Sequence, residues 1–143
     1  MDSALKEKAR PRSWRSLGKV EILRGHKTFS EILAKGTRFQ GTYIRSYILP
    51  VDWEFNRGVR VRVGFGVNRQ VKSAANRNRV RRLMREAYRL NKERLVRFAR
   101  ERQRYFSIVF LFKENKETDI SKLGLRDIEK DIQRSLDTAL TTR

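Results

Sequence analysis

The sequence predicts an α+β fold, a small and mostly antiparallel sheet packed with helices in the order α-β-β-α-β-α. Two periodicities carry this prediction. Residues 59–67 place an apolar side chain at every second position, as a half-buried strand does. Residues 80–87 instead repeat apolar side chains at helical spacing. With 143 residues, the chain is long enough for one such domain and short for two.

Residues 1–20 are predicted to form a flexible basic extension ahead of a single domain at residues 21–143. Basic side chains surround Pro11 with little apolar periodicity, which is typical of a disordered, solvated terminus. An arm that adds non-specific affinity for a polyanion is the alternative interpretation.

The first helix is predicted at residues 26–35. Phe29 and Leu33 share one of its faces, and Gly36 ends it. An extended segment follows at residues 37–51, where aromatic and aliphatic side chains alternate along the chain.

Turn-forming residues at 50–58 predict a hairpin loop between this extended segment and the strand at residues 59–67. Gly64 and Gly66 lie on the polar face of that strand, where a bare backbone suits a close approach. Either a nucleotide chain or a tightly packed helix fits this interpretation.

The remaining chain is predicted to form a basic helix at residues 73–98, a buried strand at residues 105–112 and a last amphipathic helix. The last helix has one apolar stripe, made of Leu125, Ile128, Ile132, Leu136 and Leu140.

The charge of the chain points to a polyanionic partner. Lys and Arg number 35 against 16 Asp and Glu, which gives a net charge of +19. Residues 69–104 hold fourteen basic and three acidic side chains, whereas residues 113–143 hold seven of each. Arginine outnumbers lysine 24 to 11, which favours planar, bidentate acceptors such as phosphate over a membrane surface. The domain at residues 21–143 is therefore predicted to bind a nucleic acid with one charged side.

Export and membrane insertion are not expected. The chain has no cysteine and no apolar run near its start that resembles a signal peptide. Its longest apolar block, residues 105–112, is far too short to span a bilayer. The expected location is the cytoplasm, with neither a membrane nor a small-molecule substrate as partner.

Residues 76–89 hold six arginines and one acid, threaded through an apolar helical stripe. The stripe expected to face the core consists of Val80, Leu83, Met84 and Ala87. The far side carries a row formed by Arg81, Arg85 and Arg89, with Arg82 beside them. A row of like charges at this spacing opposes helix formation unless something negative covers it.

Catalysis by the protein alone is not expected. His26, the single histidine, lies at a helix start without an obvious carboxylate partner, so a structural or solvated role is the better interpretation. The densest acidic group is Asp127, Glu129 and Asp131, interspersed with basic side chains. A solvated, ion-paired surface fits that group better than a metal site. No protein side chain is therefore assigned as catalytic or metal-binding.

Exposed aromatic side chains on a basic surface can stack on unpaired bases. The candidates are Phe29 and Leu33 on the first helix with Tyr43 and Tyr47 on the extended segment. For Phe29 taken alone, a place in the core is the stronger interpretation. The alternation of Tyr43 and Tyr47 around Arg45 favours binding, because a pure core face would rarely include an arginine.

Several motifs occur in a recognisable order. Arg77-Asn78-Arg79 is followed by Val80-Arg81-Arg82-Leu83 and Arg85-Glu86. Upstream lie Phe29, Gly36-Thr37, the strand with Tyr47, and Val63-Gly64-Phe65-Gly66-Val67 before a basic loop. This ordered set resembles the bacterial ribonuclease P protein component over residues 22–140.

The resemblance implies a compact fold like the second domain of the fifth protein of the small ribosomal subunit, with an unusual left-handed βαβ crossover. It implies a protein that pairs with ribonuclease P RNA and binds the single-stranded 5′ leader of precursor tRNA. That RNA and its Mg²⁺ ions would hydrolyse the leader from the mature 5′ end. The implied contacts with the RNA subunit are Arg77, Asn78, Arg79, Arg81, Arg82 and Arg85, to which the helical row adds Arg89. The implied leader contacts are Phe29, Leu33, Tyr47 and Arg69, to which the aromatic alternation adds Tyr43.

The loop before the signature departs from the family pattern of Ser-Lys-Lys, an apolar residue and Gly. Gln70 removes one basic contact there, and Lys72 adds one where glycine is usual. Leu33 stands where relatives often carry an aromatic residue. A ribosomal or other structural RNA-binding protein of similar fold is the alternative. A DNA-binding module is disfavoured, because so arginine-rich a helix leaves few side chains for base readout.

Overall fold

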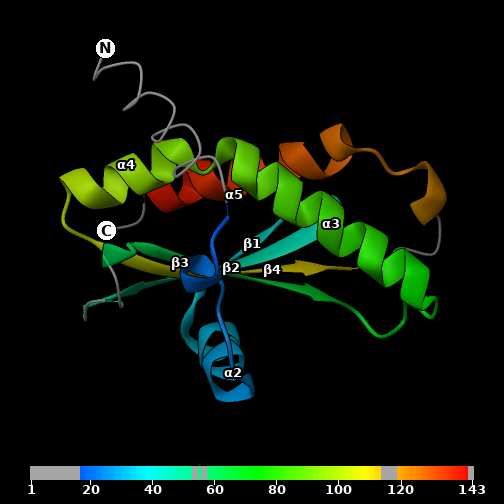
Figure 1. Ribbon diagram of the computed structural model, residues 1–143, viewed down its shortest axis with the longest axis horizontal. Coiled ribbons are helices and arrows are strands. Elements are labelled where there is room, and N and C mark those ends of the chain that lie inside the picture. Colours follow the sequence, from blue (N-terminus) through cyan, green and yellow to red (C-terminus); the bar gives the residue numbers. More distant parts are fainter. Residues whose placement is uncertain (1–16, 53–54, 56–57, 114–118, 142–143) are drawn as a thin grey trace, which may run out of the picture.

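The computed structural model describes residues 17–52, 55, 58–113 and 119–141. A four-stranded sheet forms its centre, in the order β1-β2-β4-β3 (Figure 1). Its strands are β1 (Thr37–Gln40), β2 (Ile44–Val51), β3 (Val61–Val67) and β4 (Tyr105–Phe112).

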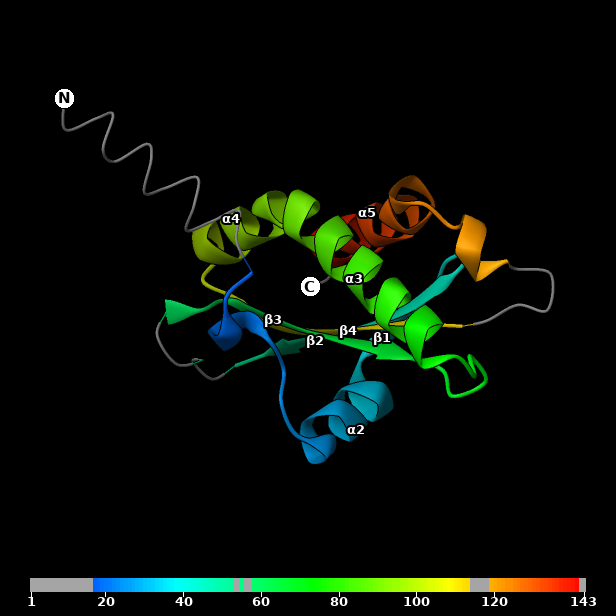
Figure 2. The same cartoon turned by 45° about the vertical axis from the view of Figure 1, so that its right-hand side comes forward.

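Helices cover both faces of this sheet. One face carries α2 (His26–Lys35), and the other carries α3 (Ala74–Asn91), α4 (Glu93–Glu101) and α5 (Leu125–Thr141), as Figures 1 and 2 show. Two short 3-10 turns, η1 (Lys19–Glu21) and η3 (Ile120–Lys122), precede α2 and α5. None of the helices among the described residues has the length and apolar character needed to cross a membrane.

The folded part of the chain begins earlier than the expected boundary at residue 21. Leu17 packs against the core, and η1 already spans Lys19–Glu21. Residues 1–16, which make up most of the expected basic extension, lie outside the described residues.

The sheet is mixed, and the expected hairpin between the extended segment and the strand at 59–67 is wrong. β4 lies between β2 and β3, antiparallel to β2 and parallel to β3. The antiparallel hairpin is instead β1–β2, inside the segment predicted as one strand. Every residue of β4 except Tyr105 and Leu111 is buried. β4 therefore takes a central position, because a central strand is covered on both faces.

The connection from β3 through α3 and α4 to β4 is left-handed, as the family resemblance implied. In Figure 2, β3 and β4 run to the right, these helices lie above the sheet, and β3 lies in front of β4. The chain therefore leaves β3, returns over the sheet and enters β4 behind it, against the usual right-handed preference.

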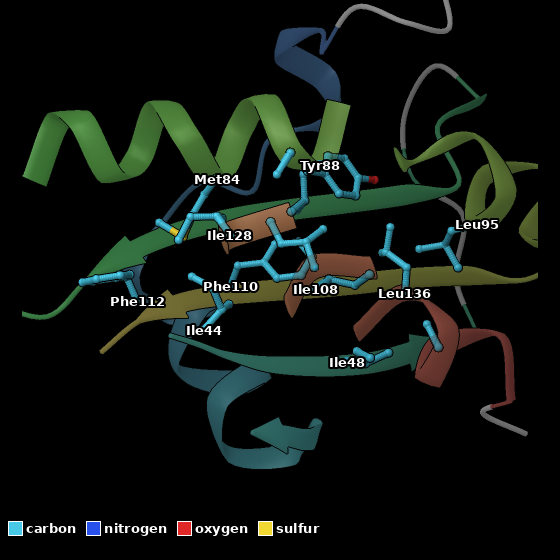
Figure 3. Close-up of a cluster of buried hydrophobic side chains, with 14 of the residues drawn as sticks. Ile44, Ile48, Met84, Tyr88, Leu95, Ile108, Phe110, Phe112, Ile128 and Leu136 are labelled. Atoms are coloured by element: carbon cyan, nitrogen blue, oxygen red, sulfur yellow. The ribbon is translucent and has the colours of Figure 1, made fainter. Parts of the chain in front are cut away.

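The main core lies between the sheet and the layer of α3, α4 and α5 (Figure 3). Met84 and Tyr88 of α3 are fully buried over β4, and the rings of Tyr88 and Phe110 lie 5.8 Å apart between centroids. Val80 and Ala87 are also fully buried. Leu83, the fourth residue of the predicted apolar stripe, is partly buried and packs against the same core, so the stripe faces the core as predicted.

The basic helix predicted at residues 73–98 is two helices, because the chain bends at Lys92. The ammonium group of Lys92 is buried and forms an ion pair with Glu21 of η1, with Nζ 2.7 Å from Oε1. Just before it, the Asn91 side chain donates to the carbonyl of Ala87, 2.7 Å away. The bend lets α4 bury Leu95 and Ala99.

Asp131 departs from the expected solvated acidic surface, because its side chain is only 2% exposed. Its carboxylate accepts hydrogen bonds from the backbone N–H groups of Thr42, Tyr43 and Ile44, at 3.1, 2.6 and 2.9 Å. These donors form the β1–β2 turn, so Asp131 fastens that turn to α5. A side chain at Gly41 would meet the carboxylate, since an added Cβ would lie 2.6 Å from Asp131 Cγ.

Replacing Asp131→Ala is expected to lower the free energy of unfolding by about 2–4 kcal/mol, because three buried N–H donors lose their acceptor. The measurement is the urea midpoint at unchanged m value. The matched control is Asp137→Ala on the same helix, which removes only an exposed ion pair with Arg94. It should cost no more than about 0.5 kcal/mol. Equal losses of unfolding free energy in both variants would show that the hydrogen bonds of Asp131 to the β1–β2 turn do not stabilise the fold.

Candidate RNA interface

The basic loop at residues 68–73 leads from the end of β3 into α3. Its turn is fixed by Asn68, whose side chain accepts a hydrogen bond from the Gln70 N–H at 2.9 Å. Ser73 then caps α3 by accepting from the Asn76 N–H at 3.3 Å. Arg69 and Lys72 project from this loop as exposed side chains. The loop therefore presents its charge at the end of the sheet.

The first two arginines of the signature contact the protein's own backbone. Arg77 Nη1 donates to the carbonyls of Val71 and Lys72, at 2.7 and 2.9 Å. Arg79 Nη2 donates to the carbonyl of Leu123, 2.6 Å away, next to the start of α5. Both side chains are half-buried. Arg77 thus holds the basic loop, and Arg79 ties α3 to the segment before α5.

The outward row of α3 consists of Asn78, Arg82 and Arg85, all exposed. At about 100° per residue, these three positions fall within about 60° of one another. Arg82 and Arg85 have no ion-pair partner within the described part of the chain. The row therefore shares Arg85 with the predicted Arg81–Arg85–Arg89 line but is turned from it by about 30°. Arg81 is half-buried at its margin.

Arg89 differs from the rest of the row because it is paired with Glu86. Arg89 Nη2 lies 2.5 Å from Glu86 Oε1, and Arg89 Nε lies 3.0 Å from Oε2. This hydrogen bonding lowers the pKa of the Glu86 carboxyl and raises the pKa of the Arg89 guanidinium. The pair is partly exposed to solvent, which screens its attraction, so it contributes little to stability. Its effect is to reduce the net charge at this end of the row.

On the opposite face of the sheet, α2 encloses a second, smaller core with Tyr47. Leu23, Ile32, Tyr47 and Val109 are buried there, and Phe29 packs against them. Leu33 is 39% exposed beside them. Tyr43 is not brought to this face, because it lies in the turn before β2 and packs against the main core instead.

Gly64 is the point where α2 touches β3. A Cβ added at Gly64 would lie 2.3 Å from Phe29 Cζ, so the bare backbone accommodates the phenylalanine ring. The sequence left two explanations for Gly64, the approach of a nucleotide chain or tight packing of a helix. The structure shows tight packing of α2.

The strand register reveals residues that the predicted leader contacts missed. Gln40, Arg45, Leu111 and Gly66 form one row across all four strands, next to the row beneath α2. Arg45, Leu111 and Gly66 are half-exposed, and Gln40 is exposed. The Asn68 N–H bonds to the Phe112 carbonyl at 3.2 Å, so the basic loop borders this row. In the sequence, the alternation around Arg45 and the bare backbone at Gly66 signalled parts of this row, whereas nothing signalled Gln40 or Leu111.

No three His, Cys, Asp or Glu side chains gather as a metal site requires, within the residues that the structure describes. His26 is exposed at the first position of α2, as the sequence predicted. The arrangement is chemically suited to binding a polyanion, because it combines the exposed arginine row of α3, the basic loop at residues 68–73 and the partly exposed row across the sheet.

Replacing Arg79→Ala is expected to lower the free energy of unfolding by about 1–3 kcal/mol, because the Leu123 carbonyl loses its half-buried donor. Arg82→Ala removes the same charge from an exposed position and should stay within about 0.5 kcal/mol of the wild type. Urea denaturation of both variants makes the comparison. A stable Arg79→Ala protein would show that this hydrogen bond does not hold the helix.

Comparison with known proteins identifies the family. A family model described as Ribonuclease P matches residues 17–139. The ribonuclease P protein component of Pelotomaculum thermopropionicum is 32% identical over 124 residues, which are 87% of this chain and 96% of that protein. The corresponding protein of Chlorobaculum tepidum is 41% identical over 86 residues, which are 57% of this chain and 54% of that protein.

Solved structures agree on the fold. The RNase P protein from Thermotoga maritima superposes with a TM-score of 0.63 at 22% identity, over 82% of this chain and 96% of that one. The RNase P protein of Staphylococcus aureus has a TM-score of 0.62 at 16% identity, over 85% and 96% of the two chains. The matched residues include the whole sheet, the basic loop and the arginine row, and the chain therefore belongs to the ribonuclease P protein family.

Proposed function

We propose that this chain binds ribonuclease P RNA and the 5′ leader of precursor tRNA, and so assists endonucleolytic removal of the leader. Family membership makes it the protein subunit of a tRNA-processing ribonuclease. The observation that carries the finer proposal is the outward row of Asn78, Arg82 and Arg85. Because the apolar stripe of α3 is buried, this row faces outward and is accessible to an external polyanion.

The RNA subunit, with its Mg²⁺ ions, carries out the hydrolysis in this proposal. The described carboxylates support that assignment, because several are already engaged within the protein. Asp131 accepts three backbone N–H groups, and Asp127 accepts the Gly124 N–H at 2.9 Å. Glu21 and Glu93 form ion pairs. The protein's part is to position RNA.

In this proposal, one surface of the protein binds the RNA subunit and a second surface binds the leader. The RNA subunit lies along α3, where Asn78, Arg81, Arg82 and Arg85 give direct contacts and Arg89 contributes if it leaves Glu86. Arg77 and Arg79 act mainly by holding the loop and helix in place. Arg79 Nε is buried and is therefore not available to RNA.

The leader lies across the α2 face of the sheet. Arg69 of the basic loop, Leu33 and the edge of Phe29 border its path, and Arg45 with Leu111 form its floor. Tyr47 is 9% exposed, so it supports this floor and offers little area for base stacking. We assign Tyr43 to the main core. The substrate, precursor tRNA, places the complex in the cytoplasm, with no membrane or small-molecule substrate.

Purified protein added to ribonuclease P RNA at low Mg²⁺ is expected to restore leader cleavage, because cationic side chains offset phosphate repulsion that Mg²⁺ otherwise screens. The measurement is the rate of 5′ leader release from labelled precursor tRNA. The protein without RNA should release none. No restoration, together with co-sedimentation on ribosomal subunits, would favour a structural ribosomal role instead.

Arg82→Gln and Arg85→Gln are each expected to reduce the slope of log K against log salt for ribonuclease P RNA by about 0.7–0.9 per lost phosphate contact. The matched control is Arg134→Gln, an exposed arginine on α5 whose loss removes the same charge. Its slope should match the wild type. A uniform decrease in all three variants would mean that net charge, rather than the α3 row, determines affinity.

A further inference from the structure

The start of β3, at the left of Figure 2, carries two arginines that pack on aromatic rings. The guanidinium carbon of Arg60 lies 4.7 Å from the centroid of the Tyr105 ring, and that of Arg62 lies 4.6 Å from the centroid of the Phe55 ring. The two ring centroids are 5.6 Å apart, and the ring planes are nearly perpendicular at 78°. These contacts join the four side chains into one cluster and orient both guanidinium groups.

Both arginines lie on the face of the sheet that carries α2. Val61 and Val63 are buried in the main core on the opposite face, and successive side chains of a strand point to opposite faces. Arg60 and Arg62 therefore point to the α2 side. Gly64, the next residue on that side, is the point where α2 touches β3.

The rings hold these arginines without neutralising them. The ion pair of Arg89 with Glu86 has no net charge, whereas an aromatic ring leaves a guanidinium group its full charge and its in-plane N–H donors. The side chains of Arg60 and Arg62 are partly exposed and have no hydrogen-bond or ion-pair partner among the described residues. Arg62 Nε is buried, so an anion would meet the two terminal nitrogen atoms of that side chain. Asp52, the described acid nearest to them in the chain, is exposed and forms no ion pair within the described part of the protein.

Exposed cations lie between this cluster and the proposed leader path. That path crosses β3 at Gly66, six residues beyond Arg60 on the same face and roughly 20 Å away. The Leu23 N–H donates to a carbonyl of β3 at 2.9 Å, so the chain that enters α2 passes β3 between the two places. Arg24 and Lys27 follow in this stretch, both exposed and without an ion-pair partner among the residues described.

Of the two proposed RNA partners, the leader fits this surface. The RNA subunit is proposed to lie along α3, which covers the opposite face of the sheet. The cluster shares its face with the leader path. Because a stacked strand rises about 3.4 Å per nucleotide, about six further nucleotides of leader would cover the distance.

We propose that the cluster of Arg60, Arg62, Phe55 and Tyr105 binds phosphates of the 5′ leader beyond the segment that lies over Arg45 and Leu111. The two rings orient the arginines, and the arginines contact the phosphates. The identity of the RNA strand rests on the proposed function, whereas the anion chemistry rests on the cluster itself. The contact then adds affinity only for leaders that are long enough to reach it.

The test compares two precursor tRNAs whose leaders have about five and about fifteen nucleotides, so that only the longer one spans both places. Binding to the complex of the protein with ribonuclease P RNA is measured against salt concentration. The longer leader should give a steeper slope of log K against log salt, by about 0.7 for each additional phosphate contact. Arg60→Gln and Arg62→Gln should each reduce this difference between the leaders by about 0.7. Arg134→Gln, the control on α5, should leave the difference at its wild-type value.

Equal slopes for the two leaders with the wild-type protein would overturn the proposal, and so would an unchanged difference in both variants. A decrease in only one variant would overturn the paired contact. Losses of equal size for both leaders would mean that these arginines contact some other part of the RNA, which also overturns it.

Arg60→Lys separates charge from packing on the Tyr105 ring. Lysine retains one phosphate contact, so this variant should keep the wild-type difference between the leaders. A deficit as large as that of Arg60→Gln would assign Arg60 a packing role and overturn the proposal. Urea denaturation establishes that each variant is folded. The proposed function fails separately, through a wild-type protein that does not stimulate release of the shorter leader.

Discussion

The apolar stripe of α3, packed against α5, β3 and β4, is the constraint on which the proposed RNA-binding surface depends. Val80, Met84, Ala87 and Tyr88 are all fully buried on one side of α3. Burying side chains of the size of Val or Met contributes about 1.5–3 kcal/mol each. Repulsion between like charges one turn apart costs only about 0.2–0.5 kcal/mol per pair. Burial therefore wins, and the helix forms with its arginines outward before any RNA arrives.

The arginines of this helix divide into two physical classes that look alike in the sequence. Arg77 and Arg79 donate to backbone carbonyls of the loop and of the segment before α5. Arg82 and Arg85 project into solvent without an acidic partner in the described chain. Under the proposed function, a substitution in this region weakens RNA binding in one of two ways, by displacing a supporting contact or by removing a phosphate ligand. Only a parallel stability measurement separates them.

The same architecture determines where the other functional surfaces lie. Because β3 runs parallel to β4 and leads into α3, its end carries the basic loop and its start faces α4. The buried ion pair of Lys92 and Glu21 connects η1 to the bend between α3 and α4. A buried ion pair is weak evidence for stability, since desolvation offsets much of its attraction. Here it holds η1 against the junction of α3 and α4.

The sequence alone determined the helices at 26–35 and 125–140, the strand at 105–112, the apolar stripe of α3 and the family, because periodicity and motif order are local properties. Only the tertiary structure decided that β4 enters between β2 and β3, since strand pairing depends on which surfaces meet across a long crossover. Tertiary structure also buried Asp131 against the β1–β2 turn and packed Tyr43 against the main core. It placed Arg45 in one row with Leu111 and Gly66. Burial and hydrogen-bond partners come from residues far away in the chain, so no local pattern around a side chain could reveal them.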